Sequence, residues 1–158
     1  HEKAAPCRFC PLRARPAGIA AAPAGTVLAN DAAGVYGSYT GRCTAPALPV
    51  ANLQEVTPGE AELWTTVLGT TAQPYTIQVE RVTMTGSDPN RNLLIRVTDK
   101  RLLDATGGVV QGMSGSPIVQ NGRLAAVLTH VLVNDPTRGY AIFATTMLEK
   151  ADAVASSK

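Results

Sequence analysis

Short apolar segments rich in Val, Ile and Thr recur from residue 25 onward, and Gly, Pro, Asn or Asp separates each from the next. Segments of this length and composition, bounded by turn-forming residues, are typical of β-strands. The pattern therefore predicts a mainly β protein, with strands at residues 25–31, 62–69, 75–84, 92–99, 116–120, 123–133 and 140–144.

Turn and helix signals divide this pattern further. Asn121-Gly122 predicts a tight hairpin, because a two-residue type I′ turn needs positive φ at both positions. The segment "NDPTRG" at 134–139 predicts the next turn. "TMLEKADAV" predicts a C-terminal helix from about residue 146, which Thr146 and Glu149 would open as a capping box.

The organisation follows from these elements. Residues 1–25 are rich in Ala, Pro and Arg without periodicity, which predicts an extended N-terminal arm. Residues 26–158 are long enough for two small packed antiparallel β-barrels, or for one barrel with a partial partner, with the helix docked outside.

Composition narrows the function classes. Apolar residues make up 45% of the chain and charged residues 16%, as in a globular protein. The net charge of +2 comes without a Lys/Arg cluster, so we expect no nucleic-acid partner. No apolar run approaches the length of a membrane span.

The cysteines leave two alternatives open. Cys7 and Cys10 have the spacing of half a zinc site, but the other half of the usual pattern is absent, so we expect no metal. A disulfide from Cys43 to one of them is expected if the protein is extracytoplasmic, and unpaired thiols are the alternative.

Ser114 stands among small residues in "GGVVQGMSGSPIV" at 107–119, just before a predicted strand. Gly112 and Gly115 let the backbone turn sharply and direct N–H groups inward. Such a turn can offer a nucleophile together with an oxyanion hole. A simple β-turn of small residues is the alternative.

A longer stretch carries a more specific resemblance. "GGVVQGMSGSPIVQNGRLAAVLTHVLVNDPTRGYAIF", preceded by "LLIRVTDKRLLDATGG", resembles the stage IV sporulation protein B peptidase family. These are serine endopeptidases related to the chymotrypsin-like clan, so the resemblance implies chymotrypsin-like antiparallel β-barrels, of which the first can be incomplete. It extends more weakly over about residues 24–148.

The resemblance also implies site residues. It makes Ser114 the acylating nucleophile, with the N–H groups of Gly112 and Ser114 as oxyanion donors. Asp99 matches the acidic member of the triad, although it could also cap a turn. Thr129 matches a hydroxyl on a strand that lines the substrate cleft. Met113 stands where trypsin-like enzymes carry an aspartate, so activation through that ion pair is excluded.

The general base is harder to find. The family supplies a histidine from a G-H-x-x-x-D motif, which this sequence does not contain. His1 is either that histidine or a foreign residue at the end of the chain. His130 follows Thr129 on the same predicted strand, and strand alternation places the two side chains on opposite faces.

The function expected from these residues is that of a serine endopeptidase, without a cofactor, that cleaves a protein substrate through an acyl-enzyme. In the resembled family the setting is extracytoplasmic signalling during sporulation, on a membrane-associated substrate, and a PDZ domain precedes the catalytic domain. This sequence lacks a PDZ domain. The alternative is a non-catalytic peptide-binding module that retains the peptidase fold.

Overall fold

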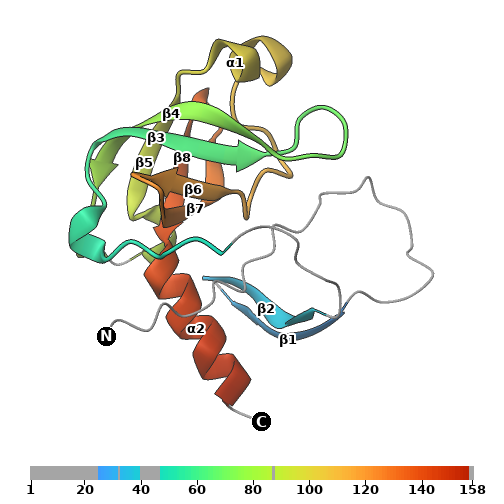
Figure 1. Ribbon diagram of the computed structural model, residues 1–158, viewed down its shortest axis with the longest axis vertical. Helices are drawn as coiled ribbons and strands as arrows, with labels where there is room; N and C mark the ends of the chain where they lie inside the picture. The colour runs from blue at the N-terminus through green and yellow to red at the C-terminus, as the bar shows by residue number, and fades with distance from the viewer. Residues whose placement is uncertain (1–24, 32, 40–46, 87, 157–158) are drawn as a thin grey trace.

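The computed structural model describes residues 25–31, 33–39, 47–86 and 88–156, and its elements are mostly strands (Figure 1). In chain order they are β1 Gly25–Asp31, β2 Gly34–Tyr39, η1 Leu53–Glu55, β3 Gly59–Thr65, β4 Gln73–Val82, η2 Pro89–Arg91, β5 Leu93–Val97, α1 Lys100–Thr106, β6 Pro117–Gln120, β7 Arg123–Leu132, β8 Asp135–Phe143 and α2 Ala144–Ser156.

Six strands close into an antiparallel barrel in the order β3-β4-β5-β8-β7-β6. Side chains alternate along each strand, so every second residue enters the barrel. On β4, for example, Tyr75, Ile77 and Val79 are buried, whereas Gln78 between them is exposed. Each fully buried Leu or Ile contributes about 1.5–3 kcal/mol, which makes this interior the main source of stability.

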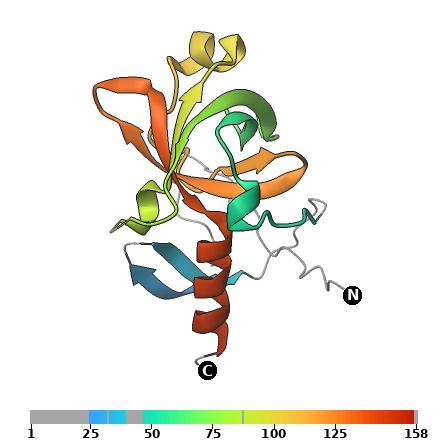
Figure 2. The same cartoon turned by 90° about the vertical axis from the view of Figure 1, so that its left-hand side faces the viewer.

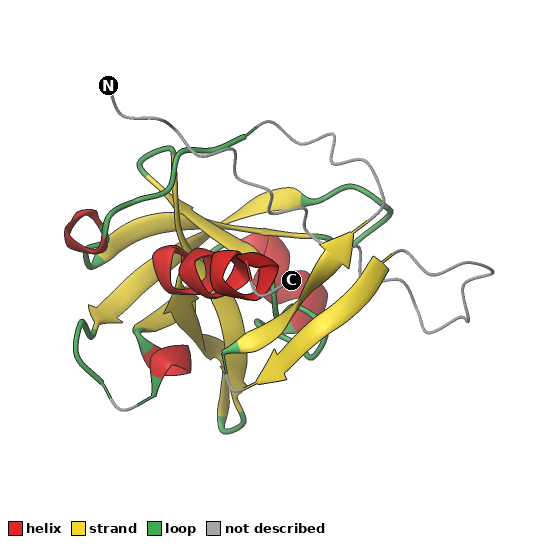
Figure 3. Ribbon diagram, turned by 90° about the horizontal axis from the view of Figure 1, so that it is seen from below, coloured by secondary structure: helices red, strands yellow, loops and turns green. Residues whose placement is uncertain are grey.

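A two-stranded sheet and a helix lie outside the barrel. The β1–β2 hairpin runs beside α2, which leaves the barrel at the end opposite α1 (Figures 1 and 2). Ala33 and Met147 pack with Val127 and Ile142 on the outer barrel face, and the Asp31 carboxylate lies 2.7 Å from Lys150 Nζ. Seen from below in Figure 3, α2 lies beside this hairpin, with barrel strands behind it.

This architecture confirms the predicted mainly β fold with a partial partner to one barrel, since the described residues form one closed barrel and one two-stranded sheet. All the predicted strands are present. The predicted arm at residues 1–25 lies, apart from Gly25, outside the described residues.

Two predicted details were wrong, and two elements were not predicted. The turn expected at 134–139 is confined to Val133 and Asn134, because β8 already begins at Asp135. The helix α2 begins at Ala144, so Thr146 lies inside it and does not cap it. The strand β2 and the helix α1 were not predicted, because β2 is glycine-rich and α1 is only seven residues long.

Candidate active site

Ser114 lies in the loop that connects α1 to β6, and its side chain is exposed. The loop begins at Gly107, whose φ of 74° ends α1 in the left-handed conformation that favours glycine. Gly112 and Gly115, with φ of 100° and 92°, bend the backbone on either side of Ser114. The small residues around Ser114 are therefore required by the backbone, as the sequence suggested.

Met113 anchors this loop to the core. Its side chain is only 5% exposed and belongs to the hydrophobic cluster inside the barrel. From the sequence alone, Met113 is only a residue that cannot form the ion pair of trypsin-like enzymes. Its burial shows how the loop is held instead: apolar packing fixes the residue before Ser114, so Ser114 itself faces solvent.

Backbone hydrogen bonds hold the loop on both sides of Ser114. Gly115 donates its N–H to the Leu128 carbonyl oxygen at 2.8 Å, and Leu128 donates to Ser116 at 2.9 Å. Within the loop, Met113 donates to the Val110 carbonyl oxygen at 3.2 Å. The Ser114 backbone is therefore fixed against β7.

Among the described residues, five backbone N–H groups of this loop have no hydrogen-bond acceptor, those of Gly108, Val110, Gln111, Gly112 and Ser114. Among the described residues, neither Gly112 nor Ser114 donates its backbone N–H to another group, whereas Met113, Gly115 and Ser116 all donate theirs. Available N–H groups at and beside a nucleophile can bind an incoming oxygen. The N–H groups of Gly112 and Ser114 are the two that the resemblance implied as oxyanion donors.

The Ser114 hydroxyl contacts a backbone group of Thr129. Ser114 Oγ donates to the Thr129 carbonyl oxygen at 2.8 Å. The Thr129 hydroxyl points elsewhere, toward the carbonyl oxygens of Asn90 at 2.7 Å and Tyr140 at 3.0 Å. Thr129 thus contacts Ser114 through its carbonyl and not through the hydroxyl that the resemblance implied, which a side-chain pattern cannot reveal.

Neither histidine is placed beside Ser114 by the structure. His130 is exposed, and its ring makes no hydrogen bond to another described residue. It pairs in register with Tyr140, over whose ring the Arg91 guanidinium lies at 5.1 Å. Cross-strand partners share a face, so His130 projects from the same face as Tyr140. His1 lies outside the described residues, as do Cys7, Cys10 and Cys43.

Asp99 is committed to the fold. Its carboxylate caps α1 by accepting from the Arg101 N–H at 2.9 Å, and it accepts from the Thr76 N–H at 3.1 Å. The Arg101 guanidinium lies 2.7 Å from Asp99 Oδ2. None of these bonds reaches a histidine. The geometry shows the capping role that the sequence left open, and the triad role stays a prediction.

The same contacts make Asp99 a source of stability that acid removes. Hydrogen bonds from Arg101, followed by the backbone N–H of Thr76, lower the pKa of Asp99 from 3.8 to about 2, although burial opposes them. Because the folded state holds the lower pKa, this stability is present above about pH 4 and is lost as the pH falls toward 2. Because the Arg101 side chain is exposed and solvent screens its charge, Asp99 contributes only about 1–2 kcal/mol to the free energy of unfolding.

We expect Asp99→Asn to remove this pH-dependent contribution. In urea unfolding at pH 6, the variant should be less stable than the wild type by about 1–2 kcal/mol, and the difference should shrink as the pH approaches 2. A difference that stays constant over this range would contradict the assignment. A loss of catalytic activity by orders of magnitude at unchanged stability would instead make Asp99 a triad member.

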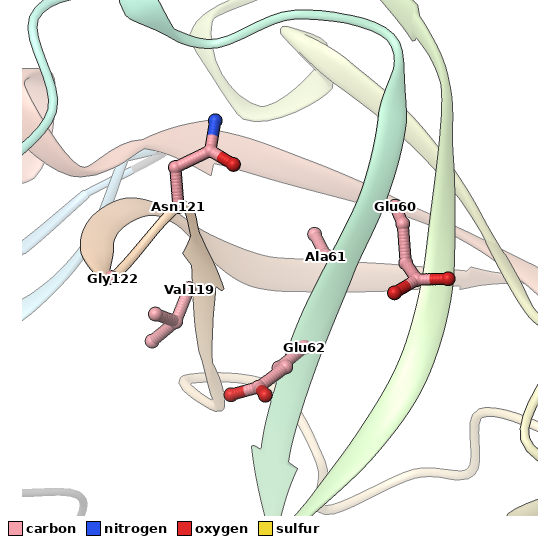
Figure 4. Close-up of a pocket in the computed structure, with 6 residues that line it drawn as sticks. All are labelled: Glu60, Ala61, Glu62, Val119, Asn121 and Gly122. Atoms are coloured by element: carbon pink, nitrogen blue, oxygen red, sulfur yellow. The ribbon is translucent and has the colours of Figure 1, made fainter.

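The described surface also has a pocket that contains none of the predicted site residues. A pocket of about 290 Å³ opens at the barrel surface where β3 meets the β6–β7 turn (Figure 4). It is lined by Glu60, Ala61, Glu62, Val119, Asn121 and Gly122, none of which is a predicted site residue.

Within the described residues, no group of three His, Cys, Asp or Glu side chains is arranged to hold a metal ion. None of the helices described is long and apolar enough to cross a membrane.

Solved structures with the same fold are proteases. The chain is similar to Rv3671c from M. tuberculosis H37Rv, in the inactive form of a Ser-to-Ala mutant, at 16% identity and a TM-score of 0.55 over 85% of this chain and 66% of that one. The active form of the Rv3671c protease is 19% identical, with a TM-score of 0.53 over 82% of this chain and 58% of the other. AlgW, an HtrA-type protease solved with a decapeptide, is 13% identical, with a TM-score of 0.57 over 84% and 40%.

These likenesses establish the fold, and the chain spans less than two thirds of the length of each of these proteins. Among curated proteins no significant relative is found. A family model, described as SpoIVB peptidase S55, matches residues 17–148, which include the whole barrel and the Ser114 loop. The chain therefore belongs to the SpoIVB peptidase S55 family, and its barrel has the chymotrypsin-like fold.

Proposed function

We propose that this domain is a serine endopeptidase in which Ser114 is the nucleophile. The observation that carries the proposal is the loop itself. Ser114 is exposed at a backbone position fixed by the buried Met113 and by β7, and the N–H groups of Gly112 and Ser114 have no acceptor among the described residues. An exposed hydroxyl on a fixed backbone, together with available N–H groups, is what acyl transfer requires.

The chemistry assigned to the site is acyl transfer. Ser114 Oγ attacks the carbonyl carbon of a peptide bond while a general base takes the hydroxyl proton, and the Gly112 and Ser114 N–H groups stabilise the oxyanion. The proton then passes to the leaving amine, and water hydrolyses the acyl-enzyme. Each oxyanion donor of this kind contributes about 3 kcal/mol to the transition state.

The base is assigned to a histidine outside the described residues. The sequence contains two histidines, and the exposed His130 shares a face with Tyr140 and makes no hydrogen bond with Ser114. His1 is the remaining candidate within the chain, and a residue beyond the sequence is the other. Asp99 is bound to Arg101 and caps α1, and its role as the triad acid stays a prediction that the Asp99→Asn variant tests.

The setting is proposed by analogy with the family. A protein substrate in an extracytoplasmic space, cleaved in a sporulation-type signalling pathway, agrees with membership in the SpoIVB peptidase S55 family. The decapeptide solved with AlgW, which has the same fold, supports a peptide as the ligand. A membrane-associated substrate and a regulatory PDZ domain are further partners that we infer from the family.

A serine-reactive fluorophosphonate probe tests the proposal without knowledge of the substrate. We expect the wild type to be labelled and Ser114→Ala to lose labelling completely, because the phosphorus atom bonds to the attacking oxygen. Ser116→Ala is the matched control, since it makes the same change in the same loop and should leave labelling intact. Intact-mass measurement reports both results.

The opposite outcomes identify the alternative. If the folded full-length protein is not labelled, or if Ser114→Ala is labelled as well as the wild type, the domain is not a Ser114-dependent hydrolase. Binding of peptides to such a protein would then favour the non-catalytic peptide-binding module. A His1→Ala variant that folds but is not labelled would identify His1 as the base.

A further inference from the structure

Thr129 occupies an irregular position in β7. Leu128 pairs with Ala141 and His130 pairs with Tyr140, so Thr129 is an extra residue with no partner of its own on β8. An extra residue of this kind is a β-bulge, which bends the strand and changes the direction of its groups. Here the carbonyl of the bulged residue accepts the hydroxyl of Ser114 at 2.8 Å.

The bulge also explains why strand alternation could not place His130. Leu128 packs inside the barrel, and a regular strand would return residue 130 to that same face. One extra residue reverses the faces, so His130 lies on the outside with Tyr140. The bulge thus directs one backbone oxygen toward Ser114 and moves the neighbouring imidazole outward.

The Thr129 side chain holds the bulge in place. Its Oγ1 lies 2.7 Å from the Asn90 carbonyl oxygen and 3.0 Å from that of Tyr140, which belong to η2 and β8. A hydroxyl has a single hydrogen to donate, so these two acceptors share it. Removal of the hydroxyl would release the bulged residue from both elements.

The contact with Ser114 has a chemical consequence. A carbonyl oxygen can only accept, so the Ser114 hydroxyl must be the donor and its hydrogen points at Thr129. A hydrogen bond made by the neutral form of a group disfavours loss of its proton. A general base must take that same hydrogen, so the Thr129 carbonyl competes with activation of the nucleophile.

We propose that Thr129 is a positioning residue that holds the nucleophile in a neutral resting state. Its side chain pins the bulge, and the bulge presents the carbonyl that keeps the Ser114 hydroxyl directed away from a base. The role rests on the proposed function, because it matters only if Ser114 is the nucleophile. It also assigns the Thr129 hydroxyl to the bulge and not to the cleft.

The rotamer of Ser114 is the first test, and it needs no activity. In the ligand-free wild type, three-bond couplings measured by NMR should show one χ1 rotamer for Ser114. Thr129→Val, which keeps the shape but has no donor, should give averaged couplings, and Thr129→Ser should restore the single rotamer. Averaged couplings in the wild type would overturn the proposal even if Thr129→Val fails to fold.

The rate of fluorophosphonate labelling is the second test. Loss of one competing hydrogen bond should make Thr129→Val react about fivefold faster than the wild type, whereas Thr129→Ser should react at the wild-type rate. Thr106→Val is the matched control, because Thr106 Oγ1 also contacts two backbone carbonyl oxygens, those of Leu102 and Gly108. It should leave the labelling rate unchanged.

These outcomes separate the two proposals. A folded Thr129→Val that reacts no faster than the wild type, or more slowly, overturns the role of Thr129. Equal acceleration in Thr106→Val would assign the effect to general loosening and overturn it as well. If no variant is labelled, the proposed function fails, and the rotamer measurement still decides whether Thr129 positions the Ser114 hydroxyl.

Discussion

Met113→Asp is expected to lower the free energy of unfolding by about 5 kcal/mol, because it removes a buried side chain and places a charge in the core. Met113 is 5% exposed and packs inside the barrel, directly before Ser114. Small domains are stable by only about 5–15 kcal/mol, so much of this variant should be unfolded at room temperature. Urea unfolding followed by circular dichroism measures the loss.

The control for this prediction is Met113→Leu, which conserves volume and should cost less than about 1.5 kcal/mol. An aspartate at this position forms an ion pair in trypsin-like loops. The stabilities of Met113→Asp and Met113→Leu therefore show whether apolar packing or an ion pair holds this loop. If the free energy of unfolding of Met113→Asp is within about 1 kcal/mol of that of the wild type, packing of Met113 in the core does not anchor the loop. The fluorophosphonate labelling of Met113→Leu should remain close to that of the wild type.

Gly108→Ala is expected to destabilise the domain by about 3 kcal/mol or more, because two independent effects add. The φ of Gly108 is 133°, which L side chains rarely adopt, and an added Cβ would lie 2.3 Å from the Pro136 carbonyl oxygen. That oxygen already accepts the Val109 N–H at 2.7 Å. The clash would therefore separate the Ser114 loop from the start of β8.

Gly107→Ala separates the two effects. Gly107 also has a positive φ, of 74°, but an added Cβ would meet nothing within 4 Å. Gly107→Ala should therefore lower the free energy of unfolding by only about 1 kcal/mol, the cost of placing an alanine at positive φ. Equal losses of unfolding free energy for the two variants would show that the approach of Gly108 to Pro136 does not matter for stability.

The strands were predictable from sequence because their signal is local. Alternation and β-branched residues mark β4 and β5 whatever packs against them, and Asn121-Gly122 does the same for the β6–β7 turn, where both residues have positive φ. The helix α1 could also have been found from its termini. Asp99 caps its start and Gly107 ends it, which are standard helix signals.

The site was only partly predictable. Ser114 stands out in the sequence because glycines surround it, and glycines at positive φ are a backbone requirement that is written into the chain. By contrast, Asp99 has a hydrogen-bond partner that lies far from it in the sequence. Its carboxylate accepts from Thr76, which is far away in sequence and reaches it only because β4 and β5 are paired.

By itself, the sequence determined that this chain forms strands around an apolar interior, and that Ser114 lies in a glycine-rich turn before one of them. Both properties depend on residues close together in the chain. Only the tertiary structure decided that Met113 is the anchor of that turn and that the Thr129 carbonyl receives the Ser114 hydroxyl. The reason is that a bulge and a barrel closure depend on the register between strands, which brings together groups that no short sequence segment contains.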